Sequence, residues 1–345
     1  MDYDTKTGGF KSLGEFLVRA RAVSIGQASD SRLVKAGHLA MSDDSLGGFL
    51  IPEEWASQIM TVALEDAIVR PRAVVLKAHT DSLHVRTIVE SDRSTYIYGG
   101  VTFTWMAPAT AISGASVISG IKFGDVEMTP HKLGGGFFTS NELMADVDNF
   151  GNLMRTFIGR ALAFVEDAAF IRGNGAGQPL GILNCPALIQ TVRAAGTSTD
   201  IYYEDLAGVA ARFLPDSWKR AVWLVSPGAL ASLIKLKRSD TALANHIDMG
   251  QNTILGRPFI VTEQATALGT FGDLILADFA HYLIADRSII IDASQHVPGS
   301  YGYVTDETFW RITLRVDGQP MLSSAITPKN GSTTVSPFVT IATHS

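Results

Sequence analysis

Cysteine and charge are both scarce in this sequence of 345 residues. Cys185 is the only cysteine, which excludes an intrachain disulfide and a metal site built from several cysteines, and we expect one buried thiol. Charged residues make up 18% of the chain, below the roughly 25% that is usual for soluble proteins. A large share of the surface is therefore expected to be covered by further copies of the chain. The formal net charge of −6 argues against nucleic-acid binding as the main task, because duplex-binding proteins usually present a basic face.

Long apolar runs and catalytic motifs are also missing. No window approaches about eighteen uninterrupted apolar residues, so we expect no membrane-spanning helix, and residues 1–21 are too polar for a secretory signal. The eight histidines show no HExxH pattern, and no G-x-S-x-G motif occurs. The GNGAG segment at 173–177 runs into Gln-Pro, so it predicts a turn and not a phosphate loop. No catalytic residue, cofactor-binding residue or metal ligand is assigned.

A long amphipathic helix is the strongest signal in the sequence. Thr139 and Glu142 have the spacing of a capping box, and Gly173 begins a glycine cluster that ends the helix. Roughly thirty residues at about 1.5 Å per residue give a rod of about 45 Å. Steps of four and three place these apolar side chains on one predicted face: Leu143, Val147, Phe150, Met154, Phe157, Ala161, Val165 and Ala168.

Charged residues on the predicted helix leave two interpretations open. They form a solvated face, or some of them pair with residues of another copy, although isolated pairs contribute little in water. The residues concerned are Asp146, Asp148, Arg155, Arg160, Glu166 and Asp167.

The remaining pattern divides the chain into an arm, a ribbon and a mixed section. Residues 1–48 are poor in large apolar side chains and contain one short amphipathic piece, Leu13–Ala22, so they predict an arm. Alternation predicts a two-stranded ribbon over 83–128, which should rest on something outside its own domain because such ribbons are marginally stable alone. Helices are predicted at 53–68, 203–214 and from Ser226 to 237, and strands at 221–225, 259–262, 274–277, 282–285, 288–292, 309–316 and 338–341.

The order of these motifs resembles that of the major capsid proteins of tailed bacteriophages with the Hong Kong 97 fold. The resemblance spans about residues 45–325 and includes the GGFLIP segment at 47–52 and the ribbon. The approach to the long helix carries Lys132, Ser140, Glu142, Leu143 and Asp146, and the exit carries Glu166, Asp167, Phe170, Gly173, Gly175, Gln178, Pro179, Gly181 and Ile182. Later matches are 255–258, 272–273, 286–287 and 315–318.

The resemblance implies an α+β, Hong Kong 97-like capsid fold. That fold has an axial domain, a peripheral domain with a long spine helix, an extended β-hairpin loop and an N-terminal arm. The implied divisions are 1–48 for the arm, 49–82 and 129–182 for the peripheral domain, 83–128 for the extended loop, 183–305 for the axial domain, and 306–345 for the return to these domains and the C-terminal tail.

The resemblance also implies a structural role without catalysis. Copies of such a major capsid protein form the pentamers and hexamers of an icosahedral shell around double-stranded viral DNA, held without sequence specificity. Implied partners are portal and scaffolding proteins, and decoration proteins in some shells, with no membrane. The implied location is the virion, after assembly in the host cytoplasm.

Two departures from the family pattern refine these expectations. Only about 45 residues precede the body and they open on Met1, so we expect no fused scaffold and a separate scaffolding protein instead. Some family members form a Lys–Asn cross-link between subunits. Here Lys122 sits away from the ribbon tip and Asn330 is the only late asparagine, so we expect no cross-link.

Within such a shell, side chains of the ribbon, the arm and the long helix are expected to contact neighbouring subunits. The candidate contacts are Tyr96, Tyr98, Phe103, Trp105, Arg93, Leu13, Phe16 and Arg155, and the candidate hinges are Gly99, Gly100, Gly120, Gly134, Gly135 and Gly136. The glycines at 134–136 predict a bend between ribbon and helix. Two alternatives stay open: an encapsulin-type compartment, which shares the fold but holds enzymes, and a soluble hydrolase.

Overall fold

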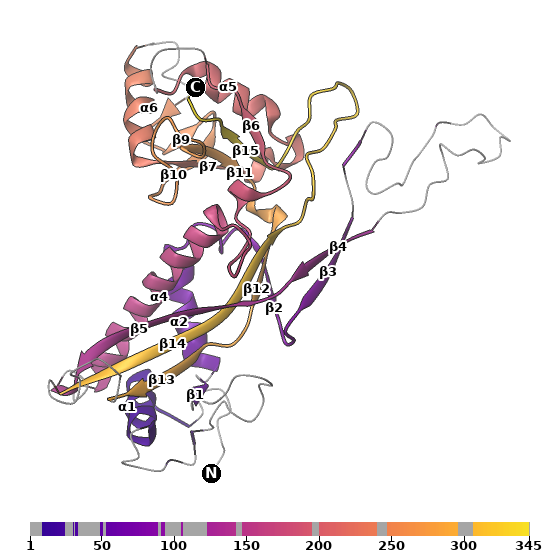
Figure 1. Ribbon diagram of the computed structural model, residues 1–345. Coiled ribbons are helices and arrows are strands. Elements are labelled where there is room, and N and C mark those ends of the chain that lie inside the picture. The colour runs from indigo at the N-terminus through magenta and orange to yellow at the C-terminus, as the bar shows by residue number, and fades with distance from the viewer. Residues whose placement is uncertain are drawn as a thin grey trace.

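Two β-sheets and a projecting ribbon organise the fold (Figure 1). The computed structural model describes residues 9–24, 30, 32–33, 49–50, 53–88, 91–93, 105, 123–142, 147–194, 200–239, 247–295 and 306–344. Both sheets mix segments from distant parts of the sequence, so the chain passes between them more than once.

The first sheet is organised around β14, its longest strand. β14 pairs antiparallel with β5 along one edge, and with β13 and then β12 along the other. Its side chains alternate between the two faces, with Trp310, Ile312 and Leu314 buried on one of them. The strands of this sheet are β1 (Phe49–Leu50), β2 (Val74–Lys77), β5 (His131–Ser140), β12 (Tyr282–Asp286), β13 (Ile290–Ser294) and β14 (Glu307–Pro320).

Helices cover the buried face of the first sheet. They are α1 (Leu13–Ser24), α2 (Glu53–Asp66) and α4 (Val147–Arg172), and α2 confirms the helix predicted there. Ile59 of α2, Phe150 of α4 and Trp310 of β14 belong to one apolar core. α2 and α4 approach closely at Gly159, where a Cβ atom would lie 2.8 Å from the Val62 side chain. A glycine is therefore required at this helix crossing.

The described part of the long helix, α4, begins after the predicted capping box. Thr139 lies in β5, opposite Thr308, and its hydroxyl accepts a hydrogen bond from Nε1 of Trp310 at 2.9 Å. The capping-box prediction is therefore wrong, because the Thr139 side chain is used inside the first sheet. The predicted end of the helix is confirmed, since α4 ends at Arg172 and Gly173 follows.

The buried face of α4 differs from the predicted face. Phe157, Ala161 and Val165 are exposed, although we expected them to be buried. Burial instead recurs at every fourth residue, at Phe150, Met154, Ile158, Leu162, Glu166 and Phe170. Four residues exceed one helical turn of about 3.6, so this stripe winds around the helix as α4 passes along the sheet.

The second sheet has the strand order β6–β15–β11–β7–β10–β9–β8. Its central strands β7 and β11 are buried along their whole length, which explains their uninterrupted apolar sequences. The strands are β6 (Ile189–Thr191), β7 (Val222–Val225), β8 (Ile247–Asp248), β9 (Thr253–Ile254), β10 (Arg257–Val261), β11 (Leu274–Ala277) and β15 (Phe338–Ile341).

Helices α5 (Tyr203–Arg212) and α6 (Pro227–Ser239) accompany the second sheet. The predicted cap of α6 is confirmed, because Oγ of Ser226 accepts from the Ala229 N–H at 3.2 Å. Short 3-10 helices occur at η3 (Ile182–Asn184), η4 (Pro215–Arg220) and η6 (Phe279–His281).

The two sheets divide the chain differently from the expected boundaries. β12 and β13 fall inside the expected axial segment, 183–305, but pair with β14 of the first sheet. β15, near the C-terminus, pairs with β6 and β11 of the second sheet. The sheet that each of these strands joins depends on pairing with strands far away in the sequence, and local sequence patterns do not predict such pairing.

The predicted ribbon is present at its base. β3 (Leu83–Ile88) pairs antiparallel with β4 (Phe123–Met128), and Leu83 lies opposite Met128. One face of this ribbon packs on Ala78 and Leu283, so its base is anchored in its own chain. Figure 1 shows β3 and β4 projecting away from the two sheets. Between β3 and β4 only residues 91–93 and Trp105 are described, so the predicted tip at 107–120 lies outside the described residues.

Candidate assembly surfaces

A buried ion network fixes the C-terminal part of α4. Arg70, in the turn after α2, donates from Nε (2.9 Å) and Nη2 (2.7 Å) to the two carboxylate oxygens of Glu166. Nη2 of Arg70 also donates to Oδ1 of Asp286, at the end of β12, at 3.0 Å. The side chains of Arg70 and Glu166 are each 2% exposed. Glu166 therefore neither forms a solvated face nor pairs with another copy; it pairs inside its own chain.

Burial and charge oppose each other in this network. Burial raises the pKa of the Glu166 carboxyl, and the neighbouring Arg70 charge acts in the opposite direction. Burial also disfavours the charge of Arg70, but the carboxylates of Glu166 and Asp286 outweigh it and raise the pKa of the guanidinium. Breaking such a buried pair by removing one partner is strongly destabilising.

Asp167 ties the same turn to α4 through the backbone. Its carboxylate accepts from the N–H groups of Ile68, at 2.7 Å, and Val69, at 3.0 Å. Burial raises the pKa of the Asp167 carboxyl, and the two N–H donors act against that shift. The solvated-face interpretation is therefore wrong for Asp167 too, because its carboxylate pairs backbone donors that would otherwise be buried alone.

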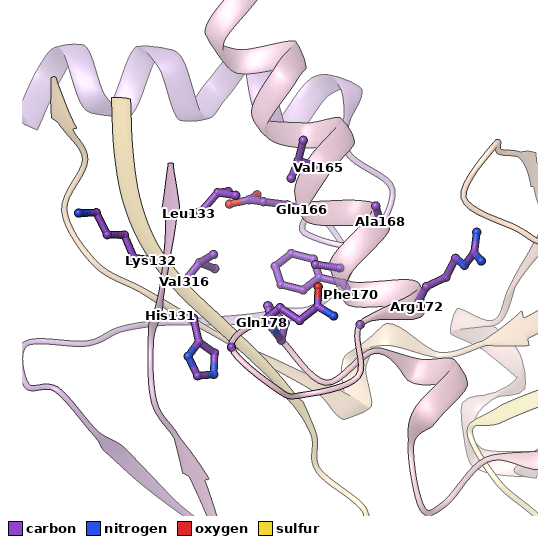
Figure 2. A pocket seen from close by; sticks show the side chains of 14 residues that line it. His131, Lys132, Leu133, Val165, Glu166, Ala168, Phe170, Arg172, Gln178 and Val316 are labelled. Atoms are coloured by element: carbon purple, nitrogen blue, oxygen red, sulfur yellow. The ribbon is translucent and has the colours of Figure 1, made fainter. Parts of the chain in front are cut away.

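A pocket of about 270 Å³ lies beside the network, between β5, β14 and the end of α4 (Figure 2). Figure 2 shows Glu166 and Phe170 projecting from α4 towards the strands, with Lys132 and Arg172 at opposite sides of the pocket. The carboxylate in its lining is already held by Arg70. The pocket therefore offers no free carboxylate, and its exposed charged side chains are the cations Lys132 and Arg172.

The turn after α4 depends on close contact between two glycines. The Gly181 N–H donates to the Gly173 carbonyl at 2.8 Å. A Cβ atom on Gly181 would lie 2.6 Å from the backbone nitrogen of Gly173, and no side chain fits there. Gly175 and Gly177 have φ of +77° and +70°, a region that glycine adopts without strain. This confirms the predicted turn.

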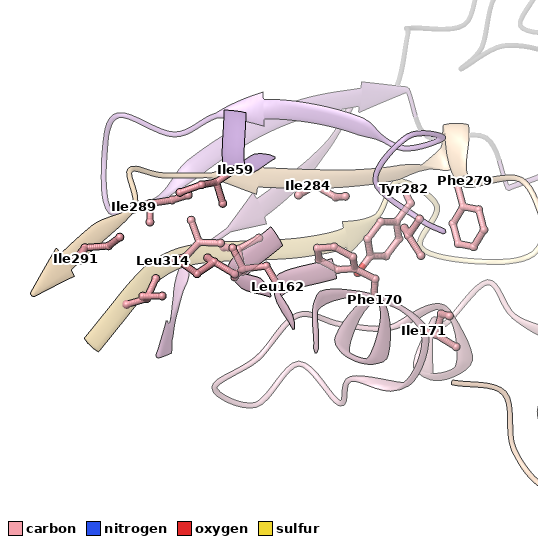
Figure 3. Close-up of a cluster of buried hydrophobic side chains, with 14 of the residues drawn as sticks. Ile59, Leu162, Phe170, Ile171, Phe279, Tyr282, Ile284, Ile289, Ile291 and Leu314 are labelled. Atoms are coloured by element: carbon pink, nitrogen blue, oxygen red, sulfur yellow. The ribbon is translucent and has the colours of Figure 1, made fainter. Parts of the chain in front are cut away.

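The turn is anchored to the first sheet by Tyr282 and by the Leu180 N–H, which donates to the Gly318 carbonyl at 2.9 Å. The Tyr282 hydroxyl donates to the Leu180 carbonyl at 2.8 Å, and its ring packs against Phe170 with centroids 5.7 Å apart (Figure 3). The Asp317 carboxylate accepts from the Thr129 N–H at 2.8 Å, and burial raises the pKa of that carboxyl. The R-x-D-G segment therefore holds backbone at the base of the ribbon.

The part of the chain that the structure describes contains neither a cluster of metal ligands nor an exposed thiol. No group of three or more histidine, cysteine, aspartate or glutamate residues there could hold a metal ion. Cys185 is buried, as predicted, and burial raises the pKa of its thiol to about 11, which makes it a poor nucleophile near neutral pH. Among the described helices, none is both long and apolar enough to cross a bilayer.

Most of the candidate ribbon contacts lie outside the described residues. They are Tyr96, Tyr98 and Phe103, together with the candidate hinges Gly99, Gly100 and Gly120. Trp105 is described and its side chain is fully exposed. Arg93 pairs with Asp216 of its own chain, Nη1 to Oδ2 at 2.9 Å, so its charge has a partner without a neighbouring subunit.

Three other candidate contacts are engaged within their own chain. Leu13 and Phe16 lie on α1 and are buried in the core of the first sheet, where Phe16 packs edge-on against Phe10. Arg155 of α4 donates from Nη1 to the side-chain oxygen of Gln58 on α2, at 3.0 Å. These side chains therefore have partners within their own chain, because α1 and α2 pack on α4, and their contact with a neighbouring subunit stays a prediction.

The candidate hinge at 134–136 is part of a strand. Gly134, Gly135 and Gly136 lie inside β5, opposite Thr313, Ile312 and Arg311 of β14. A Cβ atom on Gly136 would lie 2.7 Å from the backbone oxygen of Trp310, whereas one on Gly135 would meet nothing within 4 Å. The predicted bend between ribbon and helix is therefore wrong in location, and a hinge role for these glycines stays a prediction.

Sequence patterns missed two exposed apolar surfaces. Ile88 and Phe123 face each other across the ribbon and are 51% and 60% exposed. The second surface is a groove between α4 and β5, which includes Phe157 and Val165. Both sets of side chains had been counted as apolar, but apolar character alone does not tell a core position from an exposed one.

Comparison with solved structures gives capsid and phage proteins at low identity. The capsid of a native GTA particle superposes with a TM-score of 0.55 at 15% identity, covering 90% of this chain and 97% of that one. Chains from Mycobacterium phage Bobi (12% identity) and Microbacterium phage Oxtober96 (11%) each give 0.52, covering 81% and 80% of this chain and 91% of each of theirs. No curated protein sequence matches.

A profile described as the phage capsid family matches residues 47–330, most of the chain. The chain belongs to the phage capsid family. It is a major capsid protein with the Hong Kong 97-like fold, a structural protein of the virion whose copies assemble into an icosahedral shell. In this capsid protein the first sheet packs against α4, and the second sheet and the ribbon of β3 and β4 are separate sheets.

Proposed function

We propose that this capsid protein encloses double-stranded DNA in a closed shell of pentamers and hexamers, assembled in the host cytoplasm. The net charge of −6 fits a container whose contents are held by confinement, since tight duplex binding would need a basic face. Portal and scaffolding proteins are its proposed partners. The observation that carries the proposal is the family match over residues 47–330.

The ribbon is proposed as the main contact between subunits. Its base is anchored by Met128 in its own chain, while Ile88, Phe123 and Trp105 are exposed farther out. Burying such side chains against a neighbour stabilises the contact by roughly 25 cal/mol per Å² of apolar surface. Modest contacts suffice, because closed symmetric assembly makes each one many times.

A deletion tests the ribbon proposal. Removing residues 99–120 should leave a folded subunit, because the described base pairs β3 with β4 outside the deleted segment. We expect that variant to keep its circular dichroism spectrum and to form few shells in electron micrographs. Normal shells from the deleted chain would contradict the proposed role of the ribbon.

The DNA proposal needs a separate experiment. Particles purified from an infected host should be treated with nuclease, opened with denaturant and analysed for nucleic acid. Nuclease-protected double-stranded DNA is the expected content. A protein cargo with no protected DNA would contradict the proposal and favour an enzyme compartment, without affecting the assignment to a shell.

A further inference from the structure

An apolar groove of about 680 Å³ runs between α4 and β5. One wall is a row of α4 side chains that includes Phe157, Ala161 and Val165. The floor includes Gly135 of β5 and Ile312 of β14, which lie opposite each other in the ladder and therefore share a face of the sheet. Phe157 is 57% exposed, so this wall is unpartnered within the described chain.

The groove is a site on the sheet, beside α4, where a further helix could pack. α2 packs against the opposite flank of α4, where Gly159 meets Val62. On the β5 flank, no described helix covers the sheet. The wall residues Phe157, Ala161 and Val165 are spaced by four. Side chains at this spacing form a ridge on a helix, and such ridges pack between the side-chain rows of a second helix. Gly135 leaves the floor open for close approach, since a Cβ atom there would meet nothing within 4 Å.

Charge distinguishes the two ends of the groove. Its lining contains no charged side chain. At one end it continues, through the shared lining residues Leu133 and Val165, into the smaller pocket beside Lys132 and Arg172 (Figure 2). Both cations are exposed, and no ion pair joins either one to another described residue. An occupant that leaves the groove at this end therefore gains by being acidic there.

We propose that this groove seats an amphipathic helix of the scaffolding protein, apolar towards α4 and acidic where it passes Lys132 and Arg172. The inference rests on the proposed function, in which a scaffolding protein is a partner. A second copy of the capsid chain is a poorer source of the helix. Its described helices α1, α2 and α4 pack on their own first sheet, and α5 and α6 accompany the second sheet.

Two phenylalanines on α4 provide a matched test of the groove. Phe157 and Phe164 are 57% and 56% exposed, but only Phe157 lines the groove. The probe is a labelled synthetic amphipathic helix of about 20 residues with leucine on one face and glutamate on the other, long enough to be helical in water. Binding to the full-length subunit is measured by fluorescence anisotropy.

We expect Phe157→Ser to weaken binding of this peptide about tenfold or more, and Phe164→Ser to change it less than about twofold. Circular dichroism should show both variants folded, because both side chains are largely exposed. Equal effects of the two substitutions, or no binding to the unmodified subunit, would overturn the proposal.

Charge reversal tests the acidic end of the occupant. The double variant Lys132→Glu and Arg172→Glu should weaken the glutamate-bearing peptide, and a peptide with lysine in place of glutamate should regain the lost affinity. Such a rescue is not produced by a general loss of structure. If both peptides bind the double variant equally well, the charge part of the proposal fails.

Labelling of a cysteine placed at position 161 tests whether a second copy of the capsid chain, and not the scaffolding protein, fills the groove. Native Cys185 is buried, so maleimide labelling of Ala161→Cys reports on the groove alone. We expect labelling in free subunits and in shells assembled without scaffold, and protection when the peptide is bound. Protection in shells without any peptide would mean that a second copy fills the groove and would overturn the scaffold assignment. Absence of shells from the unmodified chain both with and without the scaffolding protein would instead count against the proposed function.

Discussion

Arg70 offers the sharpest test of how α4 and the first sheet are held together. Replacing it with methionine keeps much of the side-chain length but removes the only cation bonded to Glu166 among the described ion pairs. Glu166 is 2% exposed, so its carboxylate cannot exchange Arg70 for water. Removing one partner of a buried ion pair costs about 3–5 kcal/mol, and we expect a loss of that size.

A matched control lies two residues away. Arg72 is exposed and donates from Nη1 to the Ile68 carbonyl at 2.6 Å, so Arg72→Met should cost less than about 1 kcal/mol. The free energy of unfolding is measured on unassembled subunits by urea denaturation, with tryptophan fluorescence as the signal. If Arg70→Met loses no more stability than Arg72→Met, the buried Arg70–Glu166 pair does not hold α4 in place.

Two further measurements on Arg70→Met show how much of its lost stability comes from the unpaired charge and how much from lost packing. They are its pH dependence and the effect of adding Glu166→Gln. Without Arg70, the Glu166 carboxyl is buried and unpaired, so its pKa is raised above that of the unfolded chain. The folded variant then binds the proton more tightly, and its stability relative to the unmodified protein should recover as pH falls from about 7 to about 5. Glu166→Gln in the Arg70→Met background should likewise recover about 1–3 kcal/mol at neutral pH.

Three further predictions concern single positions. Gly181→Ala should destabilise the subunit, because the added Cβ would lie 2.6 Å from the Gly173 nitrogen. Gly208→Ala lies at an open position of α5 and should stabilise the subunit by about 0.5–1 kcal/mol. Thermal melts of the two variants check both expectations. The Cys185 thiol has a pKa of about 11 when folded, so stability should fall above about pH 9 as the unfolded thiol ionises, and Cys185→Ala should lack that component in urea titrations. Phe157→Pro should abolish soluble expression by breaking α4, while Phe157→Ser is tolerated; equal soluble yields would contradict the helix.

Local signals predicted much of the secondary structure. The strands at 274–277 and 338–341 are found at those positions because their residues are apolar, apart from Thr340, and are buried on both faces. Ser226 was identifiable as a helix cap because capping needs only a hydroxyl beside the first turn. The exit turn at 173–181 was predictable for a similar reason, since its glycines are required by contacts within the turn.

Long-range features were not predictable from the same patterns. Arg70 and Glu166 are 96 residues apart in sequence, and no local spacing links them. Thr139 fitted a capping box, but its hydroxyl instead accepts a bond from Trp310, 171 residues away. The buried face of α4 was misassigned because Phe157 and Val165 are apolar and yet line a groove. Sequence alone does not distinguish a side chain that meets its own core from one that awaits a partner.

Shell formation is tested by electron microscopy of the purified full-length chain, with size-exclusion chromatography coupled to light scattering on the same sample. We expect hollow closed particles built from many copies, either directly or after addition of the scaffolding protein. A protein that stays monomeric under both conditions, with the exposed ribbon residues Ile88 and Phe123 still unpartnered, would contradict it.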